Sequence, residues 1–143
     1  MRHLLSAISI TLLLGASVTA CGQEADVSAQ TFEDGMAAYE REDYSTALSI
    51  FQPLADQGNA SAQFNLGEMY HNGRGVQADF FEAFRWYRLA AEQGHMEAQF
   101  QVGLGYVSGT SGQRDHVEAR RWLGMVAEQG HERAEILLQA LPP

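Results

Sequence analysis

Apolar residues at helical spacing predict two consecutive helices between Asn59 and Gly94. Asn59 is a favourable N-cap, and Ala62, Leu66 and Tyr70 follow at intervals of four residues. An Asn-Gly-Arg-Gly sequence at residues 72–75 then favours a turn. A second apolar stripe begins after an Asp–Glu pair of capping-box form at residues 79 and 82, and Gly94 ends it as a left-handed C-cap. The segment is therefore predicted to fold as a helix hairpin.

The hairpin pattern recurs along the chain with a constant period. Gln-Gly pairs at residues 57–58, 93–94 and 129–130 are 36 residues apart, and the apolar positions between them keep the same phase. The repeats are predicted at 32–58, 59–94 and 95–130, with a half repeat at 131–143, and the first hairpin lacks four loop residues. Such a period is typical of stacked supersecondary units. We therefore expect an all-α protein, an α/α superhelical solenoid of about three hairpins and a C-terminal capping helix, with seven helices in all.

Three kinds of recurring residue are interpreted as structural. Glycines that follow the recurring glutamines are expected to end the second helices in a left-handed conformation. Glycines inside the first helices cost about 1 kcal/mol relative to alanine, so a partner helix is expected to pass too close there for a Cβ. Tryptophans on the second helices are expected to pack in the core. The residues are Gly58, Gly94 and Gly130, then Gly67 and Gly103, then Trp86 and Trp122.

The N-terminal segment has the layout of a secretory signal peptide. A short basic start precedes an apolar run and small residues, which predicts a signal peptide at 1–20. The next residue, Cys21, is the only cysteine in the chain, and Val-Thr-Ala-Cys at 18–21 resembles a bacterial lipobox. The resemblance implies lipidation of Cys21 and, with Gly22 after it, a place at the outer membrane facing the periplasm. Ordinary cleavage after Ala20 is the alternative.

Charge narrows the possible partners. Without residues 1–20 the chain keeps 8 Arg against 18 acidic residues, a net charge of −10. Such an acidic surface repels phosphate backbones, which argues against nucleic-acid binding. Residues 21–31 are polar and small, and they are interpreted as the lipidated cysteine and a flexible tether that precede a repeat domain at 32–143.

The repeat resembles the Sel-one-like repeat of the tetratricopeptide superfamily. The resemblance is carried by the pattern Ala-x-x-x-Leu-Gly-x-x-Tyr-x-x-Gly at 62–73, by Ala83 and Trp86, and by Ala-Ala-Glu-Gln-Gly at 90–94. The third hairpin matches most of these positions, whereas the first is more similar to a plain tetratricopeptide unit. The family implies a superhelix that holds other proteins together, with no common reaction and no cofactor.

The tetratricopeptide register implies which residues of the first helices face a concave groove. A protein or peptide partner is expected to bind there. One of the three phases is a row of phenylalanines, and the alternative is that this row fills the core between hairpins. The groove positions are Phe32, Met36 and Tyr39, then Phe64, Glu68 and His71, then Phe100, Leu104 and Val107.

Few residues of the sequence are suited to catalysis or metal binding. His95 and His131 recur at equal phase near helix starts, too far apart to share a zinc ion, and both are expected to be solvent-exposed. No nucleophile elbow or phosphate-binding loop is present. We therefore expect no enzyme activity and no metal. The alternative function is a periplasmic enzyme or small-ligand binder that uses the groove near His71 and Glu68.

Overall fold

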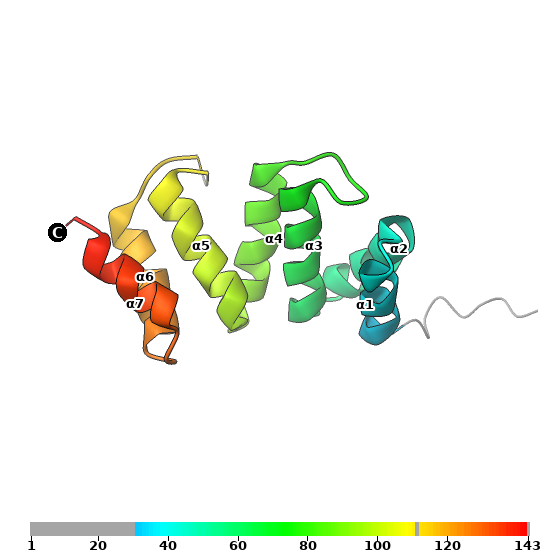
Figure 1. Cartoon of the computed structure of the whole chain (residues 1–143), viewed down its shortest axis with the longest axis horizontal. Coiled ribbons are helices and arrows are strands. Elements are labelled where there is room, and N and C mark those ends of the chain that lie inside the picture. Colours follow the sequence, from blue (N-terminus) through cyan, green and yellow to red (C-terminus); the bar gives the residue numbers. More distant parts are fainter. Residues whose placement is uncertain (1–30, 111, 143) are drawn as a thin grey trace, which may run out of the picture.

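The computed structural model describes residues 31–110 and 112–142. These residues form seven α-helices and no strand, which confirms the predicted all-α solenoid (Figure 1). The helices are α1 (Phe32–Glu40), α2 (Tyr44–Asp56), α3 (Ala60–Asn72), α4 (Phe80–Glu92), α5 (Met96–Ser108), α6 (His116–Ala127) and α7 (Glu132–Ala140).

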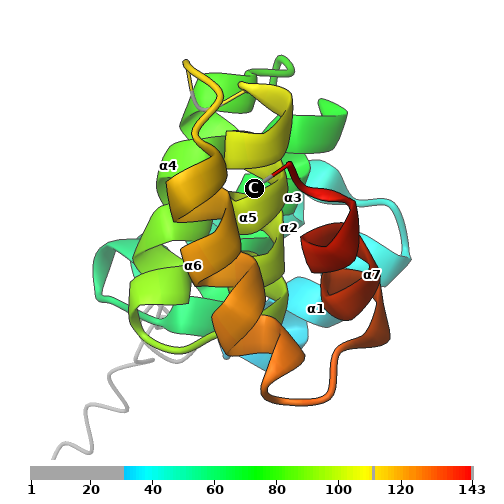
Figure 2. The same ribbon diagram turned by 90° about the vertical axis from the view of Figure 1, so that its left-hand side faces the viewer.

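The helices stack in chain order. Each one packs against its sequence neighbours, so α1–α2, α3–α4 and α5–α6 form three hairpins and α7 covers the last of them (Figure 1). Figure 2, viewed from the α7 end, shows α6 and α7 in front of the rest of the stack. The core is correspondingly divided into three clusters of buried side chains that follow one another along the stack.

Local capping explains where the helices begin and end. A side chain before every helix accepts a backbone N–H from the first turn, which satisfies one of the free helix donors. The two long hairpin turns start with Gly73 and Gly109, both left-handed C-caps with φ of 66° and 84°. The N-caps are Thr31, Asp43, Asn59, Asp79, His95, Asp115 and His131.

One detail of the predicted caps is wrong. Asp79 caps α4 as expected, but Glu82 does not return a hydrogen bond to the Asp79 N–H. That N–H donates to the carbonyl of Tyr70 on α3, and the Glu82 carboxylate pairs with Arg85. In the packed hairpin the Asp79 N–H therefore bonds to α3 and is not available to the Glu82 side chain, which would accept it in a capping box.

The first hairpin has a shorter turn than the others, as its sequence spacing indicates. Residues 41–43 connect α1 to α2, whereas residues 73–79 and 109–115 connect the later pairs. The difference is the four loop residues that the first repeat lacks. Helix α1 has nine residues, whereas α3 and α5 have 13 each, and the difference lies at the start of α1, which Thr31 caps.

Glycines mark the closest approach of the two helices in a hairpin. A Cβ on Gly67 would lie 2.5 Å from the Tyr87 ring, and one on Gly103 would lie 2.7 Å from the Leu123 side chain. Real Cβ atoms do not approach other atoms this closely, so any larger residue would push α3 from α4 or α5 from α6. The helix-interior glycines therefore permit the tight hairpins.

The tryptophans and the glycines at helix ends also have structural positions. Trp86 and Trp122 are buried, and the guanidinium groups of Arg85 and Arg121 lie 4.3 and 5.3 Å from their ring centroids. The glycines that follow α2, α4 and α6 have φ near 90°, a region that favours glycine. These are Gly58, Gly94 and Gly130.

A buried hydrogen-bond chain joins successive repeats, and the sequence interpretation missed it. The Gln63 amide donates to the carbonyl of Ala55 at 3.1 Å and accepts from the amide of Gln93 at 2.7 Å. Gln99 and Gln129 repeat this pattern one period later. Because Gln63 and Gln99 are each held by both ends of the amide, these hydrogen bonds fix the register between hairpins.

Candidate partner-binding groove

A groove of about 490 Å³ opens on the side of the stack where α3, α4, α5 and α7 meet the α5–α6 loop. Its walls are mostly aromatic and aliphatic, with a few polar groups, a composition typical of pre-formed binding sites. The lining residues are His71, Phe80, Phe84, Tyr87, Gln101, Leu104, Gly105, Val107, Ser108, Thr110 and Arg133.

The groove brings together three of the predicted contact residues, His71, Leu104 and Val107. Glu68 lies beside it, because its carboxylate accepts hydrogen bonds from two residues of the wall. The Tyr87 hydroxyl donates at 2.6 Å and the Gln101 amide at 3.4 Å. One negative charge is thus held at the edge of an otherwise apolar surface.

The hydrogen bond to Glu68 keeps Tyr87 protonated. Burial raises the pKa of the Tyr87 hydroxyl well above its usual value, and the bond to the Glu68 carboxylate raises that pKa further. The Tyr87 ring is almost fully buried, so the hydroxyl has a fixed direction. The hydrogen bond therefore holds the Glu68 carboxylate in a fixed position at the edge of the groove.

The predicted row of exposed phenylalanines is wrong at its third member. Phe100 is only 2% exposed and belongs to the core beneath α7, so the core alternative holds there. The His131 ring stacks on it at 4.5 Å between centroids, and the Arg133 guanidinium lies 4.9 Å from its centroid. Phe32 and Phe64 are partly buried and pack against the neighbouring core clusters.

The groove residues predicted on α1 are engaged within the first hairpin. Met36 and Tyr39 pack against the first core cluster, and the Tyr39 ring meets Tyr44 edge-on at 5.3 Å. The Arg74 guanidinium lies 5.4 Å from the Tyr39 centroid and 5.7 Å from the Tyr44 centroid, and it donates to the Tyr39 hydroxyl. The chain's own arginine therefore covers the predicted groove position of Tyr39.

The expectation that His95 and His131 are solvent-exposed is also wrong. Each is an N-cap whose Nδ1 accepts a backbone N–H at 3.3 Å, from Ala98 and Ala134 respectively. Each ring also stacks on a phenylalanine of the preceding repeat, and both are partly buried. Burial lowers the pKa of His95, and the negative charge of Glu97 opposes that effect in part.

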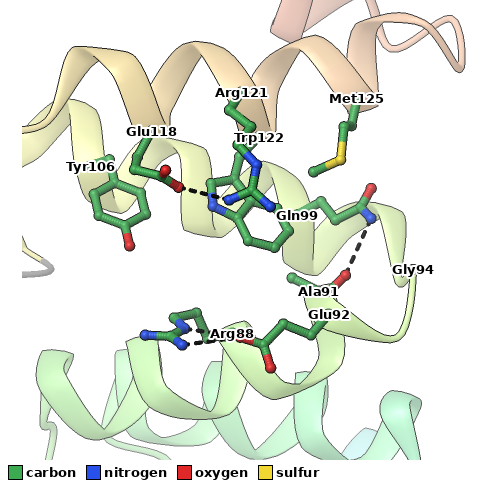
Figure 3. A pocket seen from close by; sticks show the side chains of 10 residues that line it. All are labelled: Arg88, Ala91, Glu92, Gly94, Gln99, Tyr106, Glu118, Arg121, Trp122 and Met125. Atoms are coloured by element: carbon green, nitrogen blue, oxygen red, sulfur yellow. Dashed lines mark hydrogen bonds and ion pairs between the residues drawn. The ribbon is translucent and has the colours of Figure 1, made fainter.

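A second hollow, of about 410 Å³, lies between α4, α5 and α6 (Figure 3). Its charged groups are paired locally, Arg88 with Glu92 on α4 and Arg121 with Glu118 on α6. Figure 3 shows Trp122 between these pairs, Tyr106 to one side next to Glu118, and the Gln99 amide bonded to Ala91. The same residue classes recur one period earlier, so this hollow is a feature of the repeat junction.

Glu68 and His71 contact phenol, amide and aromatic groups of the chain. Within residues 31–110 and 112–142, the hydrogen-bond donors to Glu68 are phenol and amide groups, and the His71 ring contacts Phe80 and Tyr87. No group of three or more potential metal ligands occurs in this described part of the chain. None of its helices has both the length and the apolar character that a bilayer span requires.

The comparisons with known proteins agree with the fold. The model of the Sel1 repeat matches residues 29–59, 60–95 and 97–131, which is more than half of the chain, and the chain therefore belongs to the Sel1 repeat family. Proteins of this family generally mediate protein–protein interactions and are typically non-catalytic.

Two solved structures are similar over most of the chain. A Sel1 repeat protein from Oxalobacter formigenes is 36% identical with a TM-score of 0.70, covering 76% of this chain and 44% of that protein. A protective antigen of uropathogenic Escherichia coli with an SLR fold is 38% identical with a TM-score of 0.68, covering 72% and 23%. The chain thus spans less than half of either protein.

The chain is also similar, over a shorter segment, to a eukaryotic protein. The ERAD-associated E3 ubiquitin-protein ligase component HRD3 of Candida glabrata is 41% identical over 49 residues, which is 34% of this chain and 6% of that protein. The match is the length of little more than one repeat.

Proposed function

We propose that this protein is a non-catalytic scaffold that binds a partner protein or peptide in the groove between α3, α4, α5 and α7. The observation that carries the proposal is the groove itself, open, pre-formed and walled by aromatic and aliphatic side chains. A segment of a partner could bury apolar side chains against Leu104 and Val107 while its polar groups meet Gln101 and Ser108.

Membership of an interaction family supports the same conclusion. Stacked repeats present extended concave surfaces, which are used mainly for binding. The four charged side chains of the second hollow form two ion pairs, Arg88 with Glu92 and Arg121 with Glu118. Binding is therefore the function for which the described residues are best suited.

A matched pair of valine variants tests this proposal. Val107 lies in the groove wall, and Val117 is 77% exposed on α6 outside it. Val107→Asp should reduce capture of the partner by about tenfold or more, as expected for a central contact, while Val117→Asp should not. Circular dichroism melts of both variants establish that they fold. Equal loss of capture in both, or in neither, would contradict groove binding.

We further propose that the scaffold is held at a bacterial envelope membrane by lipid on Cys21, facing the periplasm from the outer membrane. Residues 1–30, with this cysteine, lie outside the described part of the chain, and the support is the lipobox-like sequence at 18–21. Acyl chains on one cysteine would anchor the domain durably, and residues 22–31 would act as the tether.

Labelling with a fatty acid tests the anchor. Wild-type protein should incorporate the label and sediment with membranes, whereas Cys21→Ser should do neither and should keep its helical spectrum. An unlabelled wild type that stays in the soluble fraction would refute the anchor without affecting the groove proposal.

A further inference from the structure

The groove repeats a feature of the first hairpin junction in which an arginine is already bound. There, the rings of Tyr39 and Tyr44 meet edge-on, 5.3 Å apart at 68°, and the Arg74 guanidinium lies against both. Arg74 comes from the α3–α4 loop of the next repeat. At this junction, therefore, the arginine of one repeat covers a pair of aromatic rings of the repeat before it.

The second junction has a pair of rings at the equivalent positions, His71 and Phe80. Phe80 follows Tyr44 by one period of 36 residues, and His71 follows Tyr39 by the same period less the four missing loop residues. The two rings meet edge-on, 5.2 Å apart at 75°. The geometry of the ring pair is therefore preserved from one junction to the next.

The groove has a slot beside the rings of His71 and Phe80, where an arginine would lie if the second junction followed the first. The residue at the corresponding position of the chain is too short to fill this slot. One period after Arg74 stands Thr110, whose hydroxyl lies 2.9 Å from that of Ser108. Thr110 lines the groove together with His71 and Phe80, so the hollow occupies the place that an arginine side chain takes at the first junction.

The charges around the slot favour a cation. The Glu68 carboxylate is fixed by Tyr87 and Gln101, both of which line the groove, and the whole chain has a net charge of −9. Aromatic faces add attraction for a guanidinium group. Arg133, a cation of the wall, comes from α7 and lies over Phe100, so it suits a carboxylate elsewhere on the same partner.

We propose that this slot, beside the rings of His71 and Phe80, binds an arginine side chain of the partner, in the position that Arg74 takes at the first junction. This inference rests on the proposed scaffold function and specifies the partner as a segment with an exposed arginine. Its aliphatic stem would pack on Leu104 and Val107, and its guanidinium would lie against both rings, on the side toward Glu68.

A short capped peptide with one central arginine, flanked by alanine and leucine, is the probe. Its counterpart with citrulline has the same shape without the charge. Titration of the full chain in detergent, followed by NMR of the His71 and Phe80 ring protons, should give saturable shifts with arginine and binding weaker by about tenfold or more with citrulline. Equal affinity for both peptides, or no saturable shift with either, would overturn the proposal.

Thr110→Arg is the decisive variant because it supplies from within the chain the side chain that Arg74 supplies at the first junction. It should fold with an unchanged or higher melting temperature and lose binding of the arginine peptide. Phe80→Ala should also weaken binding, whereas Phe81→Ala, a neighbouring ring that is 67% exposed and outside this groove, should not. Undiminished binding by folded Thr110→Arg would contradict the slot.

The two proposals fail in different ways. If a partner is captured through Val107 but Thr110→Arg captures it equally, the arginine slot is wrong and the scaffold function stands. If the arginine peptide binds as described but no partner depends on Val107, the slot is real and the scaffold function is wrong.

Discussion

The ring of His95 stacks on the ring of Phe64, with 4.6 Å between centroids and 19° between planes. His131 and Phe100 repeat this pair one period later. In both pairs the histidine also caps the helix of its own repeat through Nδ1. A single side chain therefore starts the first helix of one repeat and packs on the first helix of the repeat before it, which links the repeats.

The cap and the stack of His95 predict a pH-dependent stability. Burial lowers the pKa of folded His95, so the unfolded chain binds more protons once the pH falls below about 6.5. Its contribution to the free energy of unfolding is therefore complete above that pH and is lost as the pH falls toward the lowered folded value. Urea unfolding at a series of pH values measures this loss.

His95→Asn is the matched variant, because Asn59 caps α3 at the corresponding position of the preceding repeat. The variant keeps a cap and removes the titrating ring, so its unfolding free energy should depend less on pH between about 5 and 7 than that of the wild type. Identical pH dependence would show that His95 is not the responsible group.

Two glycine-to-alanine changes should have opposite effects on stability. Gly67→Ala places a Cβ 2.5 Å from the Tyr87 ring and should destabilise the fold by about 1–3 kcal/mol. Gly124 lies in α6 with nothing within 4 Å of such a Cβ, so Gly124→Ala should stabilise by about 0.5–1 kcal/mol. Chemical denaturation of both tests the pair, and destabilisation by both variants would refute the packing argument.

Phe100 and Phe81 differ in burial, so their replacement by alanine should reduce the free energy of unfolding by different amounts. Phe100→Ala removes a ring from the core beneath α7 and should cost about 3–5 kcal/mol. Phe81→Ala changes a ring that is 67% exposed and should stay within about 0.5 kcal/mol of the wild type. Thermal melts measure both. A melting temperature for Phe100→Ala close to that of the wild type would restore the view that Phe100 faces the groove.

The glutamine chain predicts a penalty for a change that keeps the size of the side chain. Gln99→Glu leaves the carbonyl of Ala91 without its donor and should cost about 1–3 kcal/mol at neutral pH. Protonation of the introduced carboxyl restores the donor, so the penalty should shrink as the pH falls. Glu135→Gln, one period later on an exposed face, is the control and should change stability by less than about 0.5 kcal/mol.

The helices and their ends could be predicted from the sequence because they depend on nearby residues. Asn59, Asp79 and Asp115 cap helices within a few residues of themselves, and Gly73 and Gly109 are required where the chain turns. The period of 36 residues then fixed the order of the hairpins.

The exposure of individual side chains could not be predicted in the same way. Phe100 lies on the helix face predicted to be concave, but His131 and Arg133 of the following segment cover its ring. The position of a residue along a helix predicts which face its side chain lies on. It does not predict which residues of the next repeat will cover that side chain. Arg74 is a similar case, since its contacts with Tyr39 and Tyr44 depend on the path of a loop.

A signal for the glutamine chain was present in the sequence. Gln63 and Gln99 stand at one phase beside the core alanines, and Gln93 and Gln129 at another. A polar residue that recurs at a core phase needs a partner, because burial without one is unfavourable. The repeat period pairs these residues, although it does not show which atoms bond.

Photo-crosslinking in living cells tests the central claim, binding of a partner in the concave groove, most directly. A photoreactive residue is placed at Leu104 in the groove wall or at Phe81 on the exposed side of α4, in the full-length chain with its own N-terminus. If a partner binds in the groove, position 104 should give a discrete crosslinked adduct with it, Val107→Asp should remove that adduct, and position 81 should give little or none. Equal adducts from both positions, or an adduct from position 81 alone, would contradict groove binding.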